Sequence, residues 1–101
     1  MDVSAILGKW KLDGNGYPGS LEFKLEGGQL TARLNYDVAK KWETLTNVKF
    51  VPDTGVVSFT RPWAGNPGFQ QYQGRLVDGI IRGQFTDNHS PGQPFPWSTA
   101  R

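Results

Sequence analysis

The sequence predicts an all-β fold, an eight-stranded up-and-down antiparallel barrel. Eight short runs of alternating apolar and polar residues recur about every 10–12 residues, a spacing typical of small barrels and sandwiches. The thirteen glycines and seven prolines fall mostly between these runs, where turns are needed. The joints are of hairpin length, which favours a meander over a Greek key. Closing the sheet into a barrel would remove its exposed edges.

The first three predicted strands show the clearest alternation, which indicates one buried and one wet face in each. They cover residues 7–12, 20–26 and 30–36. Their inward positions are Trp10, Leu12, Leu21, Phe23, Leu25, Leu30, Ala32, Leu34 and Tyr36. Gly27-Gly28 joins the second strand to the third, because glycine accepts the positive φ of a tight primed turn.

The fourth predicted strand, 43–51, needs an irregularity. Leu45 and Val48 are three positions apart, so they cannot face the same way in a regular strand. One extra residue near Thr46-Asn47 would restore the register, so we expect a β-bulge there. The proline and glycine of 52–55 predict a turn after the strand.

The last four predicted strands cover 56–61, 69–77, 80–86 and 95–101. Their inward positions are Val57, Phe59, Tyr72, Gly74, Leu76, Ile81, Gly83, Phe85, Phe95 and Trp97. Asp78-Gly79 predicts a two-residue hairpin turn between the sixth and seventh strands.

The predicted joints alternate in length along the chain. The short joints are 27–28, 52–55 and 78–79, and the long joints are 13–19, 37–41, 61–68 and 87–94. In an up-and-down sheet the odd-numbered joints share one end and the even-numbered joints share the other. We therefore expect one end closed by tight turns and a mouth formed by four irregular loops.

Composition limits the class of protein. The length of 101 residues suits a single β-barrel domain, 1–101, and the absence of cysteine excludes disulfides. The N-terminal residues lack the features of a signal peptide, and no apolar run could span a bilayer. We expect a soluble, cytoplasmic protein without membrane contact. The net charge of +2 is small and only Lys40-Lys41 are adjacent cations, so no nucleic-acid partner is predicted.

Two apparent motifs do not fit the chemistry they suggest. Residues 14–19 match G-x-G-x-x-G, but a strand follows them where a dinucleotide site needs a helix. Asp87, His89 and Ser90 lie too close in sequence to converge as a catalytic triad. His89 is the only histidine, which leaves little material for a metal site. We expect no catalytic residue, no metal and no cofactor.

The predicted mouth carries two aromatic side chains in polar loops. Trp63 lies between prolines in the third long joint, and Tyr17 lies in the first. Exposed aromatics on a polar rim are typical of ligand or partner sites, although Trp63 could equally fold over the core. Asp13, Asp37 and Asp87 sit where strands enter the mouth, and such positions usually reflect turn chemistry.

Both ends of the chain resemble lipocalin and avidin barrels, which are calycin-type folds. Gly8-Lys9-Trp10 is similar to their G-x-W signature, and Trp97 to Arg101 is similar to the W-x-x-x-R near the end of avidin-type barrels. The run 69–74 resembles an avidin strand. The resemblance implies that Trp10 plugs the closed end with Arg101 packed over it, a favourable cation–π pair. Biotin is not implied, because Leu12 and Gly16 stand where the family has polar contacts.

We therefore expect a non-catalytic binding protein that holds a small, partly apolar ligand at the open end of the barrel. Apolar lining of this kind with a few convergent polar groups is the usual make-up of a ligand pocket. Inward aromatics would supply stacking surface, from Tyr36, Phe59, Tyr72 and Trp97. Rim side chains would orient or cover the ligand, from Asn15, Tyr17, Arg61, Trp63, Gln70 and His89.

Two alternatives stay open. The rim loops could bind a carbohydrate or a protein, as lectins and protease inhibitors do. The barrel could also be a small enzyme of the cyclase or isomerase type, if Arg61, Tyr72 and Asp87 converge in a pocket. A lumen filled by its own side chains would exclude both lumen hypotheses. A homo-oligomer is neither predicted nor excluded.

Overall fold

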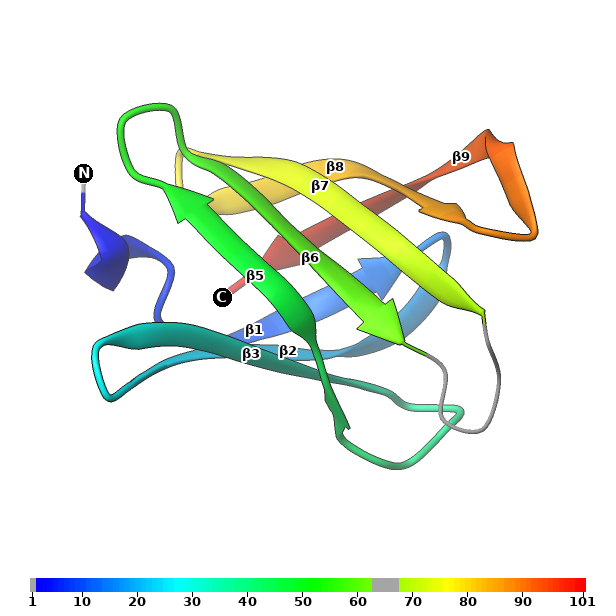
Figure 1. Ribbon diagram of the computed structural model, residues 1–101, viewed down its shortest axis with the longest axis horizontal. Helices are drawn as coiled ribbons and strands as arrows, with labels where there is room; N and C mark the ends of the chain where they lie inside the picture. Colours follow the sequence, from blue (N-terminus) through cyan, green and yellow to red (C-terminus); the bar gives the residue numbers. More distant parts are fainter. Residues whose placement is uncertain (1, 63–67) are drawn as a thin grey trace.

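The computed structural model describes residues 2–62 and 68–101, and all strands found there belong to one antiparallel sheet (Figure 1). The elements are η1 (Val3–Ala5), β1 (Gly8–Gly14), β2 (Tyr17–Glu26), β3 (Gln29–Tyr36), β4 (Glu43–Thr44), β5 (Thr46–Val51), β6 (Val56–Pro62), β7 (Phe69–Val77), β8 (Ile80–Asp87) and β9 (Ser90–Ala100). Neighbouring strands follow the order β4-β3-β2-β1-β9-β8-β7-β6-β5.

The sheet curls into a nearly closed barrel whose seam is formed by β4 and β5. β4 pairs with β3, β5 pairs with β6, and the N–H of Leu45 between them donates to the carbonyl of Ala32 at 3.0 Å. The described residues therefore form nine strands where the sequence predicted eight. The predicted strand 43–51 is divided at Leu45, where the chain changes from one neighbouring strand to the other.

The predicted irregularity in this segment is confirmed. Asn47 has a φ of 51°, in the left-handed region, and the register with β6 shifts between Thr46 and Lys49. The resulting β-bulge buries Leu45 and partly buries Val48 against the same core.

Two of the four joints predicted to be long are tight turns. β1 and β2 are joined by Asn15-Gly16, and β8 and β9 by Asn88-His89. In the first turn, φ is 51° at Asn15 and 90° at Gly16, the positive values that a primed hairpin turn needs. The strands therefore continue through segments that the glycine and proline content predicted as loops.

Strand β9 is much longer than the predicted 95–101, although it contains three prolines. β8 pairs with β9 at Ser90 and again from Phe95, and the register shift between these pairs leaves residues 91–94 without a ladder partner. β1 pairs with β9 only from Trp97 onward. Pro91 and Pro94 thus lie outside both ladders, and Pro96 pairs with β8 where β9 lacks a ladder with β1. Proline is tolerated on such an edge because its missing N–H breaks no ladder bond there.

The core contains an aromatic ladder across four adjacent strands. Each ring lies opposite the next across a pair of strands: Phe59 opposite Tyr72, Tyr72 opposite Phe85, and Phe85 opposite Phe95. Their ring centroids are separated by 4.8 Å, 4.6 Å and 5.5 Å in turn. Trp97 packs edge-on against Phe59 and Tyr72, and its indole N–H reaches the carbonyls of Gln73 and Gln84, each at 3.1 Å.

The predicted inward side chains are buried or partly buried, with one exception. Leu25 is 45% exposed because it lies close to the Gly27-Gly28 turn, where its cross-strand partner Leu30 is also only partly covered. The alternation that predicted the strand faces therefore holds until the last residues of the hairpin.

Trp10 and Arg101 meet at the end of the barrel that carries the β2–β3 turn, as the sequence resemblance implied. The guanidinium carbon of Arg101 lies 3.8 Å from the centroid of the Trp10 ring. The same guanidinium donates to the carbonyls of Leu7 at 2.8 Å and Ala5 at 3.1 Å. The Trp10 indole donates to the Ile6 carbonyl at 2.9 Å, so one cluster fixes both ends of the chain against β1.

Replacing Arg101 by alanine is expected to lower the free energy of unfolding by about 1–3 kcal/mol, through loss of the cation–π contact and two charge-assisted hydrogen bonds. Arg101→Lys should recover only part of this loss, because an ammonium cannot reach both carbonyls in the same fork. Urea unfolding followed by tryptophan fluorescence measures both variants. Equal stability of Arg101→Ala and the wild type would show that the cluster is dispensable.

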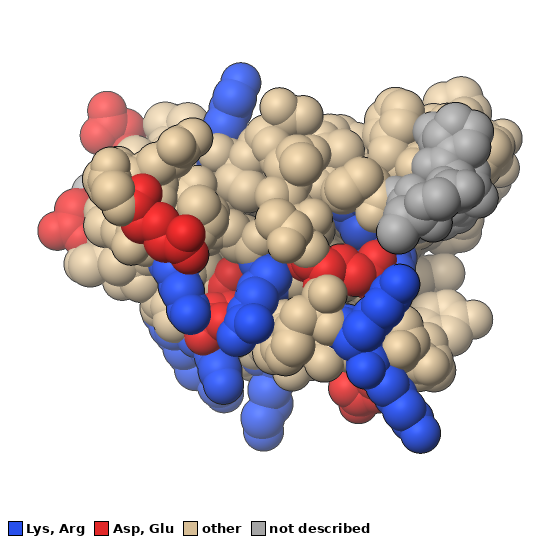
Figure 2. Space-filling view, turned by 60° about the horizontal axis from the view of Figure 1, so that its bottom comes forward, with Lys and Arg blue, Asp and Glu red and all other residues tan. Residues whose placement is uncertain are grey.

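Lysine and arginine gather on the side of the molecule that carries β1–β3, with acidic side chains among them (Figure 2). Register and alternation place Lys9, Lys11, Lys24 and Arg33 on this outer face. Glu22 lies between them and accepts a hydrogen bond from Arg33 at 2.7 Å. The fold thus gathers cations that looked scattered in the sequence, but it also pairs part of their charge.

No helix in the described part of the chain is both long and apolar enough to cross a membrane.

Candidate functional site

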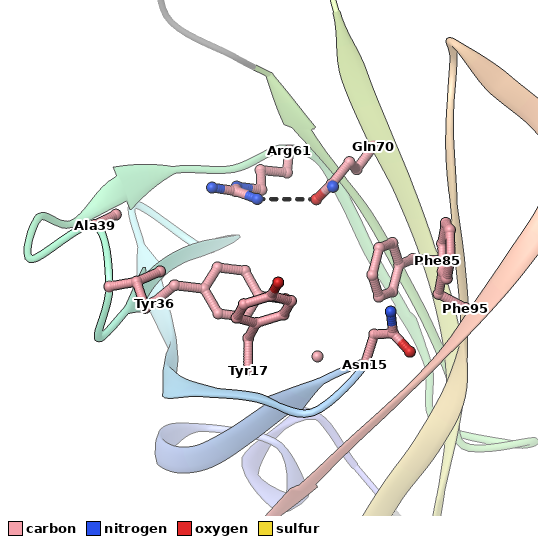
Figure 3. Close-up of a pocket in the computed structure, with 10 residues that line it drawn as sticks. Asn15, Tyr17, Tyr36, Ala39, Arg61, Gln70, Phe85 and Phe95 are labelled. Carbon is pink, nitrogen blue, oxygen red and sulfur yellow. Dashed lines mark hydrogen bonds between the residues drawn. The ribbon is translucent and has the colours of Figure 1, made fainter.

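A pocket of about 300 Å³ opens at the end of the barrel opposite Trp10 (Figure 3). It lies between the β1–β2 turn, the loop after β3, and the inner faces of β6 to β9. The lining residues are Gly14, Asn15, Tyr17, Tyr36, Val38, Ala39, Arg61, Gln70, Phe85 and Phe95. Tyr17 is 56% exposed and Val38 is 72% exposed, so the pocket opens to solvent beside them.

The apolar wall of the pocket is the outer end of the aromatic ladder. Phe85 stacks on Tyr72 on one side and contacts Phe95 on the other, and both phenylalanines border the cavity (Figure 3). Their positions follow from the alternation along β8 and β9 and from the register Phe85↔Phe95. A flat apolar group in the pocket would therefore meet aromatic surface.

The polar wall is a connected network centred on Arg61 and Gln70. Two nitrogens of Arg61 donate to the two carboxylate oxygens of Glu43, at 3.3 Å and 2.9 Å. A third donates to Oε1 of Gln70 at 3.0 Å (Figure 3). The Arg61 guanidinium also lies 4.9 Å from the centroid of the Tyr36 ring. The position of the Arg61 guanidinium is thereby fixed by a cation–π contact with its planar face and by hydrogen bonds from all three of its nitrogens.

Two tyrosine hydroxyls extend the network into the core. The Tyr72 hydroxyl donates to Gln70 Oε1 at 2.8 Å and lies 2.9 Å from the Tyr36 hydroxyl. Because the single proton of Tyr72 is given to Gln70, Tyr36 must donate to Tyr72. The Tyr36 hydroxyl rests against Gly14, where any Cβ would overlap it. Gly14 is therefore required for the hydroxyls to meet.

Burial controls the ionisation of this network. It raises the pKa of Tyr72 far above its ordinary value, and the neighbouring Tyr36 raises it further. Burial also raises the pKa of Tyr36. For Arg61, burial would lower the pKa, but the hydrogen bonds and charge of Glu43 outweigh it and the pKa is raised. The site therefore contains neutral phenols beside a permanent cation.

The two buried tyrosines are expected to make the protein lose stability in alkali. An unfolded tyrosine ionises near pH 10.0, whereas the raised pKa values keep Tyr36 and Tyr72 protonated in the folded chain. Above that pH the folded state binds more protons than the unfolded state, so the free energy of unfolding falls as pH rises. A tyrosine that is ionised in the unfolded state and protonated in the folded state contributes a slope of at most about 1.4 kcal/mol per pH unit.

Urea unfolding measured from about pH 8 to about pH 11 gives this slope. Tyr72→Phe should reduce it by the contribution of one tyrosine, whatever the variant does to stability at neutral pH. An unchanged slope in Tyr72→Phe would mean that Tyr72 ionises as readily in the folded chain as in the unfolded one.

The lumen beneath the pocket is filled by side chains. Trp97, Phe59 and Tyr72 are at most 2% exposed and pack against one another, and Phe23 contacts Phe59 edge-on from the other side of the barrel. The closed half of the barrel is thus packed with side chains, and the pocket lies in the open half. Among the described residues, these side chains occupy the space that a ligand deeper in the lumen would need.

The pocket brings together five of the residues predicted for it: Asn15, Tyr17, Tyr36, Arg61 and Gln70. Tyr72 lies directly beneath them through its hydrogen bond to Gln70, and Trp97 lies deeper in the packed half. His89 is exposed in the β8–β9 turn and does not line the pocket. Trp63 lies outside the described residues. Whether any of these side chains contacts a ligand stays a prediction.

Several residues in or beside the pocket were not predicted for the site. Phe85 and Phe95 were recognised as inward, but alternation alone does not tell which inward residues lie at the open end. Val38 and Ala39 come from the loop after β3. The predicted length of this loop was the one sequence feature that indicated its place at the mouth. No sequence pattern predicted that Glu43 would bind Arg61, because the two residues meet only across the seam of the barrel.

The three residues that would support an enzyme converge only in part. Arg61 and Tyr72 both bind Gln70, but Asp87 does not line the pocket, and its carboxylate accepts the backbone N–H of His89 at 2.9 Å. Among the residues that the structure describes, no three histidine, aspartate or glutamate side chains gather as metal ligands.

Comparison with known proteins identifies the fold. No protein-family model matches the sequence, and no curated protein matches it. The crystal structure of apo lipid binding protein 8 of Caenorhabditis elegans superposes with a TM-score of 0.63, covering 100% of this chain and 98% of that chain. The two sequences are 11% identical, so the likeness shows the fold alone. The chain shares the β-barrel fold of that protein, and the likeness to lipocalins and avidins stays a prediction.

Proposed function

We propose that this protein is a non-catalytic binding protein that holds a small, partly apolar ligand in the pocket at the open end of the barrel. One observation carries the proposal: an aromatic wall from Phe85 and Phe95 faces polar groups from Arg61 and Gln70 across one cavity. A few polar groups placed in an apolar, concave site are what a ligand pocket requires.

The size of the cavity restricts the ligand. Its volume of about 300 Å³ lies at the lower end of the range for small-molecule sites, about 300–1,000 Å³. The comparison barrel is, by its name, a lipid binding protein. In this chain Trp97 and Phe59 occupy the space below the pocket, so a long acyl chain would have no room to enter the lumen. The proposed ligand is therefore compact.

The rim-loop alternative has less support. The first of the four loops that would present a binding surface is only the two-residue turn Asn15-Gly16. The enzyme alternative is weakened by the position of Asp87, outside the pocket.

Filling the pocket is expected to abolish binding. In Ala39→Trp, an indole from the loop after β3 would occupy the cavity without changing a strand. The wild type is titrated with a panel of one-ring aromatic alcohols and amides and followed by backbone amide NMR. We expect the amide signals of Phe85, Phe95 and Gln70 to shift. We expect affinity to fall at least about tenfold in Ala39→Trp.

Val77→Trp is the matched control, because Val77 is 55% exposed at the end of β7 that leads to the Asp78-Gly79 turn, away from the pocket. It should bind the panel as the wild type does. Shifts that persist in Ala39→Trp, or that cluster away from the pocket in the wild type, would refute the proposed site.

A further inference from the structure

Arg61 is the single charged side chain among the described residues that line the pocket. A guanidinium at the edge of an apolar cavity would ordinarily attract a carboxylate or phosphate, because it offers a rigid fork of donors. The choice between an anionic and a neutral ligand thus depends on what neutralises Arg61.

Glu43 neutralises it from outside the cavity. Its carboxylate is engaged by two Arg61 nitrogens in a forked arrangement, at 3.3 Å and 2.9 Å, and it does not line the pocket. The side chains of Arg61 and Glu43 are only 16% and 13% exposed, so water screens the pair weakly. The ion pair therefore brings no net charge to the wall of the pocket.

An anionic ligand beside Arg61 would lie close to the Glu43 carboxylate as well. The two negative charges would compete for one guanidinium in a partly buried site, where like-charge repulsion is strong. A neutral ligand meets no such repulsion. It still finds donors, because Arg61 uses three of its five N–H groups within the described residues.

We propose that Glu43 is a specificity-determining residue, which makes this pocket select a neutral ring compound with a carbonyl or hydroxyl acceptor and reject the corresponding anion. This inference rests on the proposed function. The acceptor would meet the remaining N–H groups of Arg61 and the amide nitrogen of Gln70, while the ring lies against Phe85 and Phe95. Glu43 acts through Arg61 and touches no ligand itself.

Benzamide and benzoate test the charge preference, because they share size and shape and differ in charge. Calorimetric titration at neutral pH, with the site checked by amide NMR shifts of Phe85 and Phe95, should show benzoate binding at least about tenfold more weakly than benzamide to the wild type. Glu43→Gln keeps an acceptor for Arg61 and removes the negative charge. It should strengthen benzoate binding at least about tenfold and change benzamide binding less than about threefold.

Two variants separate charge from structure. Glu43→Asp keeps the negative charge and should still reject benzoate. The double variant Glu43→Gln with Arg61→Gln carries no charge at all and should lose the gain in benzoate affinity. The wild-type comparison of the two probes needs no variant, so it stands even if a substitution prevents folding.

The outcomes distinguish the inference from the function on which it rests. Benzoate binding as tightly as benzamide in the wild type, at Phe85 and Phe95, would overturn the role of Glu43 and leave the proposed pocket intact. No benzoate gain in a folded Glu43→Gln variant would also overturn it. Failure of both probes to shift the pocket in the wild type and in Glu43→Gln would overturn both proposals.

Discussion

Replacing Gly83 by alanine is expected to destabilise the barrel by about 3 kcal/mol or more, a large fraction of the roughly 5–15 kcal/mol by which a native domain is stable. Gly74 and Gly83 face each other across β7 and β8, and a Cβ on Gly83 would overlap the carbonyl of Gln73 and come within 2.5 Å of the Gly74 Cα. Both contacts are with backbone, so no side chain can move to relieve them. The two strands would have to separate.

The Trp97 indole adds to this cost. A Cβ on Gly74 would lie 2.8 Å from its ring, so the ring rests on the glycine pair while its N–H bonds the flanking carbonyls of Gln73 and Gln84. Separating β7 from β8 would remove the backbone surface on which this buried tryptophan packs. The Gly83 substitution therefore damages the core as well as the sheet.

Gly92→Ala is the matched control for Gly83→Ala. Gly92 lies in β9 with no positive φ, and a Cβ added there would have nothing within 4 Å, so its stability should change by less than about 0.5 kcal/mol. Urea unfolding of both variants gives the comparison. Equal stabilities would mean that β7 and β8 do not approach as closely as the structure has them.

Removing Arg61 is expected to have the second largest effect. Arg61→Met would leave the Glu43 carboxylate partly buried without its cation and would remove a donor from Gln70, for an expected loss of about 2–4 kcal/mol. The double variant Arg61→Met with Glu43→Leu replaces the whole pair by apolar groups. It should recover most of the loss, because an uncompensated charge is costlier than no charge.

A double-mutant cycle by urea unfolding measures this coupling between Arg61 and Glu43. Losses that simply add, without recovery in the double variant, would show that the pair contributes no interaction energy. The ion pair would then not explain why Arg61 keeps a fixed position in the polar wall of the pocket.

Local sequence patterns predicted most of the core residues of this protein. The alternation in β2, β3 and β7 follows from the two-residue period of a strand, so Phe23, Leu34 and Tyr72 could be assigned to the core without a structure. The bulge near Asn47 was predictable for the same reason, because Leu45 and Val48 could share a core only with an extra residue. The contact between Arg101 and Trp10 was predicted from the resemblance of their short motifs to those of lipocalin and avidin barrels.

Turn lengths and cross-strand partners were less predictable. Glycine and proline between two runs indicate a turn but not its length, so Asn15-Gly16 and Asn88-His89 were overestimated as loops. β2 continues through Pro18 because this residue pairs with β1 and not with β3, whereas Pro91 and Pro94 of β9 lie in a segment that pairs with neither neighbour. Both arrangements are properties of the assembled sheet.

The polar wall depends on register across the whole barrel. Glu43 and Arg61 lie 18 positions apart and meet at the seam, and Tyr36 and Tyr72 lie 36 positions apart and meet across the lumen. No local pattern contains such distances. The sequence could therefore place Arg61, Gln70 and Tyr36 at one end of the barrel, but not assemble them into one network.

Native mass spectrometry of the protein, purified gently from its own host, tests the central claim most directly. We expect a noncovalent adduct of one compact molecule on the wild type and on Val77→Trp, absent from Ala39→Trp. An adduct of equal abundance on Ala39→Trp would contradict the pocket as the binding site. A wild type that carries no small molecule would contradict the claim that the pocket holds a ligand.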